Sequence, residues 1–230
     1  DMGQCCGGTV KVLLEILSQA DINKLSKHSQ KLVVLEHPLK SGASTEVLRT
    51  DDDKNFKPFL KKESFILPTA RNLDPLFIYG AGHVGRALVK IIEHTDFDIH
   101  WVDIDEKRFP EGSTSNFSKV IALDPALIAS HAPSNAYHVI ITHSHPLDEA
   151  ICFALLSKDQ FRFCGLIGSK TKNARFRSRL SKMGIKAEQL KKLTCPIGID
   201  EINSKQPVKV AISIAAQLSI WQETNGIRMV

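Results

Sequence analysis

The sequence lacks the features that mark several large classes of protein. It has no apolar run approaching the ~20 residues that span a membrane, and its first residues lack the basic-then-apolar form of a signal peptide. No run of Lys and Arg is long or interleaved with aromatic residues, so the net charge of +5 does not by itself indicate nucleic-acid binding. We therefore expect a cytoplasmic protein that binds neither membranes nor nucleic acid.

Cysteines are few as well. The chain has five in 230 residues, an odd number, which favours free thiols in a reducing cytosol over a disulfide framework. Cys152 and Cys164 lie in apolar runs and are predicted core residues, whereas the loop position of Cys195 leaves its role open. The hydrophobic fraction of 43% is typical of a globular protein, and the length allows one large domain or two small ones.

What the sequence does contain, near its centre, is a strand, a glycine turn, a helix and a second strand in that order. Apolar residues 76–79 lead into the turn, a helical pattern of apolar residues follows, and the second strand, near 99–102, ends at Asp103. This order is typical of a dinucleotide-binding βαβ unit. The helical face is expected to comprise Val84, Ala87, Leu88, Ile91 and Ile92.

Each residue of the turn has a predicted role. Gly80 permits the sharp bend, Gly82 lets the backbone approach a pyrophosphate, and Gly85 lets the helix pack closely on the strand. The helix N-terminus attracts an anion, and His83 in its first turn is a further predicted cofactor contact. Asp103 is placed to bind a ribose diol. The turn thus predicts NAD or NADP binding, with another phosphorylated ligand, or none, as the alternative.

Strands and helices alternate from here to the end of the chain, which predicts a Rossmann-like parallel sheet with flanking helices. Further strands are expected near 119–123, 137–142 and 161–167, and further helices near 124–131, 146–157, 172–183, 188–193 and 207–221. We divide the chain into a partial N-terminal domain, 1–72, and a Rossmann-like domain, 73–230.

The N-terminal part has a small, mostly β pattern. Strands are expected near 9–17, 31–36 and 65–67, with a helix near 21–28 and a polar, turn-rich stretch over 41–57. Some 70 residues with two or three strands make a thin core. We expect this part to be the tail of a larger N-terminal domain whose first part is missing or is supplied by a partner chain.

A polar segment, Thr-His-Ser-His-Pro-Leu-Asp, follows the fourth strand of the predicted sheet. His143, His145 and Asp148 could hold a metal, in a pattern that resembles the His-x-His-x-x-Asp box of metallo-β-lactamase-like hydrolases. That fold needs further His ligands downstream, and no His follows His145. The alternatives are a helix cap, with Ser144 or His145 as the N-cap residue, and a polar contact from either His to a ligand.

The fifth strand leads into a second glycine-containing loop. Gly168, Ser169 and Lys170 form a predicted anion cradle at the start of a helix. The spacing does not fit a Walker loop. The helix carries one basic stripe, consisting of Lys172, Arg175, Arg179 and Lys182. This stripe is interpreted as a solvated face, with phosphate contact or docking of an acidic partner as alternatives.

An unusual Gly-Gln-Cys-Cys-Gly-Gly stretch lies at the start of the chain. Adjacent cysteines form only a strained ring, so Cys5 and Cys6 are not expected to form a stable disulfide. Thiols on a glycine loop are accessible and could carry sulfur or bind a soft metal such as molybdenum. The alternative is a pair of buried, inert cysteines.

Six segments, taken in order, resemble the XdhC/CoxI family of xanthine dehydrogenase accessory proteins over nearly the whole chain. They are GQCCGG, IYGAGHVGRAL, VDIDEKRFP, THSHPLDEAIC, GLIGSKTKNARFRSRL and PIGIDEINSKQPVKVAISIAAQL. The family's cysteine motif falls on Gln4, Cys5 and Cys6. Its Rossmann part falls on Gly80, Gly82 and Gly85.

The resemblance implies a cytosolic maturation factor with no catalytic residue of its own, connected with purine catabolism. Such proteins are thought to bind molybdenum cofactor, to protect it while a cysteine desulfurase helps to install its sulfido ligand, and to hand it to a xanthine dehydrogenase-type molybdoenzyme. We also expect a homo-oligomer. The remaining hypotheses are an NAD(P)-dependent oxidoreductase, for which the sequence offers no Tyr-x-x-x-Lys pair, and a metal-dependent hydrolase.

Overall fold

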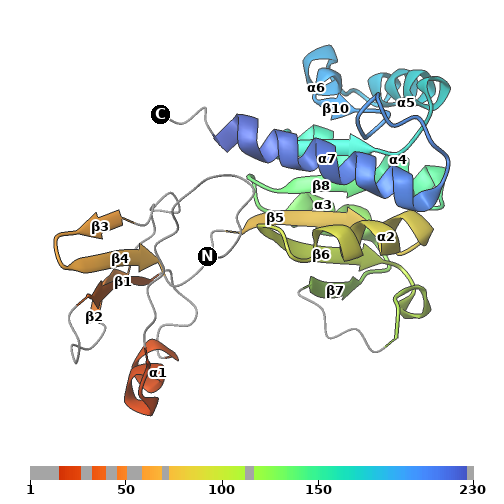
Figure 1. The fold of residues 1–230 in the computed structure, drawn as a ribbon. Coiled ribbons are helices and arrows are strands. Elements are labelled where there is room, and N and C mark those ends of the chain that lie inside the picture. The colour runs from red at the N-terminus through yellow and green to blue at the C-terminus, as the bar shows by residue number, and fades with distance from the viewer. Residues whose placement is uncertain are drawn as a thin grey trace. The chain divides into compact units, whose positions relative to one another are not determined.

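The computed structural model describes residues 16–26, 33–39, 46–50, 59–68, 73–111 and 117–226. The chain divides into two units, Asp1–Asn72 and Leu73–Val230 (Figure 1). Gln4, Cys5, Cys6 and most of the strand expected over 9–17 lie outside the described residues. No helix of the described part is long and apolar enough to cross a membrane.

The first unit contains, in its described residues, a helix and a four-stranded antiparallel sheet of order β2-β1-β4-β3. Its elements are α1 (Gln19–Ser26), β1 (Val33–Pro38), β2 (Glu46–Thr50), β3 (Phe59–Lys61) and β4 (Ser64–Pro68). The helix and the strands near 31–36 and 65–67 were predicted to within two residues. The prediction of a turn-rich stretch was wrong over β2, and β3 was missed, because short edge strands carry little hydrophobic periodicity.

The second unit is built on a six-stranded, all-parallel sheet of order β10-β9-β8-β5-β6-β7. Its strands are β5 (Asp74–Tyr79), β6 (Phe97–Asp103), β7 (Phe117–Ile121), β8 (Tyr137–Ile140), β9 (Phe163–Leu166) and β10 (Leu193–Thr194). The Rossmann-like α/β architecture predicted from the sequence is confirmed. The strand β10, two residues long, was not predicted.

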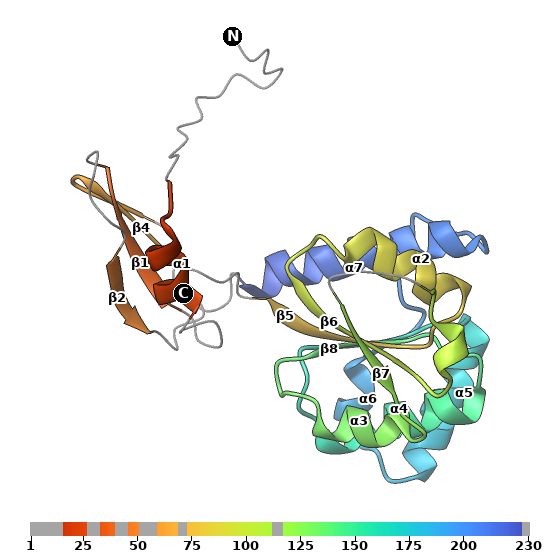
Figure 2. The ribbon, with the colours of Figure 1, turned by 90° about the horizontal axis from the view of Figure 1, so that it is seen from below.

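Helices cover both faces of this sheet. They are α2 (His83–Ile92), α3 (Pro125–His131), α4 (His145–Lys158), α5 (Lys170–Lys182), α6 (Ala187–Lys191) and α7 (Pro207–Gly226), with a 3-10 turn, η1 (Glu106–Arg108). Figure 2 shows α2 and α7 on one face and α3, α4, α5 and α6 on the other. The unit therefore has three layers, and each face of the sheet has its own apolar core.

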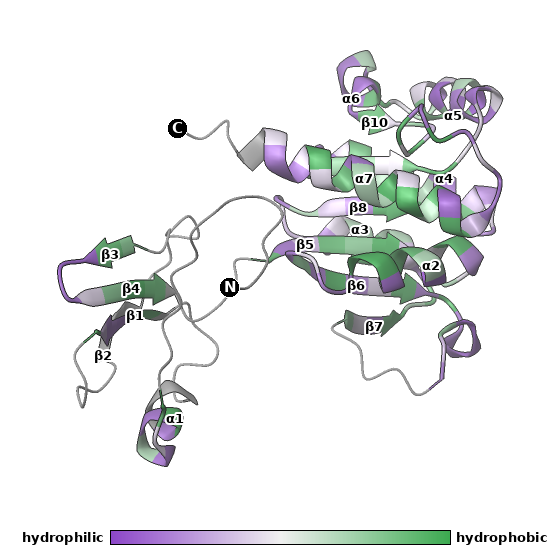
Figure 3. Ribbon diagram, viewed as in Figure 1, coloured by the Kyte–Doolittle hydropathy of each residue, from purple (hydrophilic) through white to green (hydrophobic). Residues whose placement is uncertain are grey.

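Alternation along the central strand explains why residues 76–79 are apolar throughout. Leu76 and Ile78 belong to the core under α2 and α7, whereas Phe77 and Tyr79 belong to the core under α3 and α4. All four are buried, as expected for a parallel strand covered on both faces. Figure 3 shows the same pattern, with hydrophobic colour along β5 and hydrophilic colour on much of α5.

One prediction about helix burial was wrong in part. Ile91 was placed on the buried face of α2 but is 39% exposed, and Val89 is buried in its place. In the last helix, α7, the apolar residues Val208, Ile212 and Ile220 are likewise exposed. Only one side of each helix meets the sheet, so an apolar residue on the other side stays in contact with solvent.

The order of the strands reverses direction around β5, which pairs with β6 on one side and with β8 on the other. In open parallel sheets of this kind, ligands bind in the crevice beyond the carboxyl ends of the strands at such a switch point. The glycine turn follows β5, and the Thr142–Asp148 segment follows β8. The topology thus brings these two segments to the same edge.

Candidate functional site

Two glycines of the first turn are required by the fold itself. Gly80 has φ +119°, and a Cβ placed there would lie 2.6 Å from the carbonyl oxygen of Ile141. A Cβ on Gly85 would overlap the carbonyl oxygen of Gly80. Both observations agree with the packing roles predicted for these glycines, in a sharp turn and in the close approach of α2.

The packing of the fold does not require glycine at position 82. Its φ of −76° is ordinary, and a Cβ placed there would meet nothing within 4 Å. No side chain caps the N-terminus of α2, whereas Ser144 caps α4 and Ser169 caps α5. The turn therefore presents open space in front of helix N–H groups that have no intrahelical acceptor, which is the arrangement that an anionic ligand fits.

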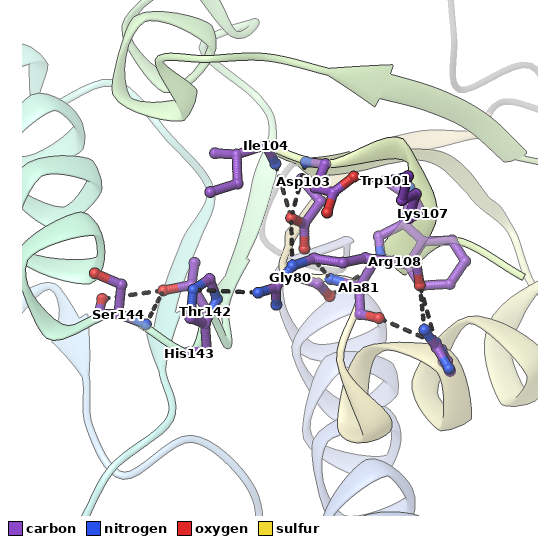
Figure 4. A network of polar contacts seen from close by, with 12 residues as sticks. Gly80, Ala81, Trp101, Asp103, Ile104, Lys107, Arg108, Thr142, His143 and Ser144 are labelled. Carbon is purple, nitrogen blue, oxygen red and sulfur yellow. Dashed lines mark hydrogen bonds and ion pairs between the residues drawn. The ribbon is translucent and has the colours of Figure 1, made fainter.

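Asp103 is buried behind the turn rather than free in the crevice, and it is only 5% exposed. Its Oδ2 accepts a hydrogen bond from Ala81 N at 2.6 Å, and its Oδ1 accepts one from Ile104 N at 2.8 Å (Figure 4). The Arg108 guanidinium lies 3.6 Å from Oδ1. The carboxylate thus ties the glycine turn to the end of β6, and a ribose diol would have to share oxygens that already accept backbone N–H groups.

Three further side chains brace the same turn. Trp101 Nε1 donates to the Gly80 carbonyl at 3.1 Å. Arg86 Nε donates to the carbonyl oxygens of Ala81 at 3.1 Å and of Arg108 at 3.0 Å. Arg108 Nη2 lies 3.3 Å from His143 Nε2, and Figure 4 shows the resulting link from the glycine turn to the segment after β8. Neither Arg86 nor Arg108 was predicted from the sequence. Arg86 donates to backbone carbonyls, which no motif marks, and the partners of Arg108, Asp103 and His143, are brought to it only by the fold.

The segment after β8 is a helix cap with a buried acid. Ser144 accepts a hydrogen bond from Leu147 N at 3.4 Å, so Ser144 and not His145 is the N-cap of α4. Asp148 is fully buried, and Thr142 Oγ1 donates to its Oδ1 at 2.6 Å. Among the described residues, no three His, Cys, Asp or Glu side chains are grouped so that they could hold a metal ion. The metal site that the sequence left open at His143, His145 and Asp148 is therefore not formed by these side chains, and the alternative of a helix cap holds for Ser144.

The second loop also differs from the simple cradle that the sequence suggested. Ser169 accepts from Lys172 N at 3.1 Å and caps α5. Lys172 Nζ donates to Asp148 Oδ2 at 2.7 Å and to the Ile167 carbonyl at 2.8 Å, and its side chain is 13% exposed. The interpretation of the basic stripe as a solvated face is thus wrong for Lys172, whose ammonium group neutralises a buried carboxylate.

Two hollows open at this edge of the sheet. The smaller one is lined by residues that include Gly80, Asp103, Ile104, Thr142 and His143. The larger one has a volume of about 470 Å³ and is lined by residues that include Thr142, His145, Gly168, Ser169, Lys172 and Arg175. Thr142 borders both hollows. The structure thus places Gly80, Asp103 and His143 at the smaller hollow and His145, Gly168 and Ser169 at the larger one. His83 and Lys170 lie exposed in the first turns of α2 and α5.

The three cysteines in the described part of the chain are buried free thiols. Burial raises the pKa of Cys164 to about 12 and raises that of Cys152 well above its usual range. Burial also raises the pKa of Cys195, although the nearby charges of Lys172 and Arg177 act in the opposite direction. The core positions predicted for Cys152 and Cys164 are confirmed, and none of the three is an activated thiolate.

The doubly wound sheet, with a glycine turn at its switch point, defines a Rossmann-type fold. The profile of the family described as the XdhC Rossmann domain matches residues 76–218. The chain belongs to this family, and the resemblance noted in the sequence is confirmed.

Two further proteins are similar to this chain. The uncharacterized protein YqeB of Escherichia coli (strain K12) is 29% identical over 153 residues, which make up 62% of this chain and 26% of YqeB. A crystal structure of a xanthine dehydrogenase (BH1974) from Bacillus halodurans is similar with a TM-score of 0.63 and 19% identity, covering 90% of this chain and 66% of that chain. The chain thus spans about a quarter of YqeB, and the likeness to the solved structure concerns the fold alone.

Proposed function

We propose that this chain is a maturation factor that binds molybdenum cofactor and assists its sulfuration and its insertion into a xanthine dehydrogenase-type molybdoenzyme. Its partners in this function are that enzyme and a cysteine desulfurase, and it works as a homo-oligomer. The proposal rests on membership of the XdhC family. The name of the Bacillus halodurans structure, a xanthine dehydrogenase, agrees with it.

The observation that carries the proposal is the open glycine turn. Gly80 and Gly85 are explained by the fold, whereas the space in front of Gly82 is explained by no residue of the described part of the chain. A flat pterin with a phosphate tail fits an open turn bordered by a second polar hollow, because the planar ring needs an unobstructed backbone and the phosphate needs helix N–H groups or cations. When bound, the cofactor would supply the molybdenum centre of the target enzyme.

An NAD(P)-dependent oxidoreductase is the other function that such a turn could serve, and no observation in the structure favours it. Both oxygens of Asp103 already accept backbone N–H groups. Tyr79 and Tyr137 are fully buried inside strands, and burial raises the pKa of each. Neither tyrosine is placed to move a proton at the carboxyl edge of the sheet.

Co-purification tests the role of the turn. The full chain is produced in a molybdenum-sufficient host, and the released ligand is measured as molybdenum and as pterin fluorescence. Gly82→Val fills the open space without backbone strain, so we expect a folded protein with at least tenfold less bound cofactor. Lys90→Val is the matched control, because it places the same side chain on the exposed far end of α2. Equal cofactor content in the Gly82→Val protein and the control would contradict the proposal.

Cys5 and Cys6 complete the proposed site as the groups that contact molybdenum or pass sulfur, since soft thiolates suit both tasks. Changing both to serine conserves their size and removes the soft ligands. In reconstitution of an apo-molybdoenzyme, we expect the double variant to give inactive enzyme that lacks the sulfido ligand, with bound molybdenum measured in parallel. Full activation by the Ser-Ser protein would show that the thiols are not needed.

A further inference from the structure

The larger hollow, between α4 and α5, is lined by basic side chains. His145 comes from the first residue of α4, and Lys172, Arg175 and Arg179 come from successive turns of α5. Figure 2 shows the two helices on the same face of the sheet. A volume of about 470 Å³ is far larger than a water molecule needs, so the hollow has room for a group of ligand size.

The charges around this cavity are unequally compensated. The Asp148 carboxylate accepts hydrogen bonds from Thr142 and Lys172, and Glu149 forms an ion pair with Arg179 at 3.0 Å. Arg175 has no hydrogen bond or ion pair within the part of the chain that the structure describes. Both carboxylates beside the cavity are thus neutralised, and the guanidinium of Arg175 remains available for an anion.

The loop that lines the cavity adds hydrogen-bond donors to these basic side chains. This loop, Gly168 and Ser169, leads into the 13-residue helix α5. The Ser169 side chain takes up the Lys172 amide, which leaves the amides of Lys170 and Thr171 without an intrahelical acceptor. The positive end of the helix dipole and a guanidinium side chain therefore face the same space, and together they match the oxygens of a phosphate.

We propose that this cavity is a binding site for a phosphate monoester, with Arg175 as its principal charged contact, and that it is separate from the Gly80–Gly85 turn. The buried pair of Asp148 and Lys172 positions the loop, and Arg175 meets the phosphate. This inference deepens the proposed function and rests on it for one detail only, namely that the ester is the phosphate tail of molybdenum cofactor. Thr142, which borders both hollows, would then be a contact of the part of the ligand between them.

Amide NMR of the full chain tests the site directly, with inorganic phosphate and methyl phosphate as probes. We expect both probes to shift the amide signals of Lys170 and Thr171, and we expect Arg175→Gln to weaken binding at least fivefold. Lys182→Gln removes a charge from the same helix outside the cavity and should leave the affinity unchanged. Response to inorganic phosphate but not to methyl phosphate would overturn the assignment to an ester.

Two other results would also overturn the proposal. One is a shift confined to His83 and Val84, which would place the phosphate at the glycine turn instead. The other is equal affinity in the wild-type chain and in Arg175→Gln. Because the probes contain neither pterin nor molybdenum, failure to co-purify molybdenum cofactor would count against the proposed function, while the NMR result would still decide the cavity.

Discussion

The two strand–loop–helix turns at the carboxyl edge of the sheet are held in their conformations by different interactions. The turn after β5 depends on glycine, because Gly80 needs positive φ and Gly85 must admit the backbone of Gly80. The loop after β9 depends on side chains, because Ser169 caps its helix and Lys172 neutralises a buried acid beneath it. The first turn is thus fixed by steric contacts and has open space beside Gly82. The second is fixed by a buried ion pair and borders a hollow that is lined by basic side chains.

This difference separates packing from binding within one motif. Glycines that look equivalent in the sequence are not equivalent in space, since a Cβ on Gly82 meets nothing and a Cβ on Gly85 meets backbone. Likewise, Lys172 and Arg175 belong to one basic stripe, yet of these two only Lys172 forms an ion pair with a buried carboxylate. Substitutions that separate these pairs are therefore the most informative ones.

The largest effect is expected from Gly85→Ala. The new Cβ would overlap the Gly80 carbonyl oxygen, which is backbone and is itself held by Trp101 Nε1. We expect a loss of more than about 5 kcal/mol in the free energy of unfolding, above the roughly 1–3 kcal/mol usual for overpacking, because the atom in the way belongs to the backbone. Chemical denaturation measures it, with Gly82→Ala as the control because that Cβ meets nothing. Equal losses at the two positions would mean that the turn is not closely packed.

Lys172→Met should have the next largest effect. It keeps the aliphatic stem and removes the ammonium group, which leaves the fully buried Asp148 carboxylate with Thr142 as its remaining side-chain partner. Breaking a buried pair in this way costs about 3–5 kcal/mol. Denaturation of the single variant and of Lys172→Met combined with Asp148→Asn measures the coupling. The double variant should recover much of the loss, and no recovery would show that the stem and not the charge matters.

The sequence predicted the frame of this site well and its interior poorly. The βαβ order, the packing roles of Gly80 and Gly85 and the candidate cap at Ser144 follow from local patterns, because turn sterics and helix capping act between near neighbours in the chain. The pairing of Asp148 with Lys172 spans 24 residues and depends on how α4 meets α5. The hydrogen bond from Ala81 N to the Asp103 carboxylate depends on the register of β5 against β6. Such contacts leave no periodic pattern in the sequence. A metal site at Asp148 could therefore be excluded only from the way in which α4 packs against α5.

Acidification should lower the stability of the sheet on which both turns are built, through His138, a buried residue of β8. Burial, with a smaller contribution from the charge of Lys158, lowers the pKa of His138 to about 3. The unfolded chain binds a proton at this side chain below about pH 6.5 and the folded chain does not. The contribution of His138 to stability is therefore complete above pH 6.5 and is lost as the pH falls towards 3, at about 1.4 kcal/mol per pH unit, or about 2 kcal/mol at pH 5.

Denaturation of the wild-type chain and of His138→Gln between pH 7.5 and 5 measures this contribution. Other groups titrate in both proteins, so the difference between the two slopes isolates His138. The variant loses the contact between His138 Nδ1 and the Tyr79 hydroxyl, which is 3.1 Å long, and is expected to be less stable at pH 7.5 but less sensitive to acid. Parallel slopes would mean that His138 takes up a proton in the folded protein as readily as in the unfolded chain.

The smallest effect is expected from Gly168→Ala, the counterpart of Gly85→Ala in the second loop. Its Cβ would lie 2.8 Å from Cδ of Lys172 and 3.3 Å from Sγ of Cys195, which are side-chain atoms and not backbone. A lysine stem can move by a few tenths of an ångström, but its Nζ is held by Asp148 at 2.7 Å, so we expect a loss of about 1 kcal/mol. Denaturation of Gly168→Ala in the wild-type and Lys172→Met backgrounds measures it. In the Lys172→Met background the stem is no longer tethered, and the loss should shrink. A loss as large as that of Gly85→Ala, unchanged by Lys172→Met, would show that the second loop is also fixed by backbone sterics and would remove the distinction between the two turns.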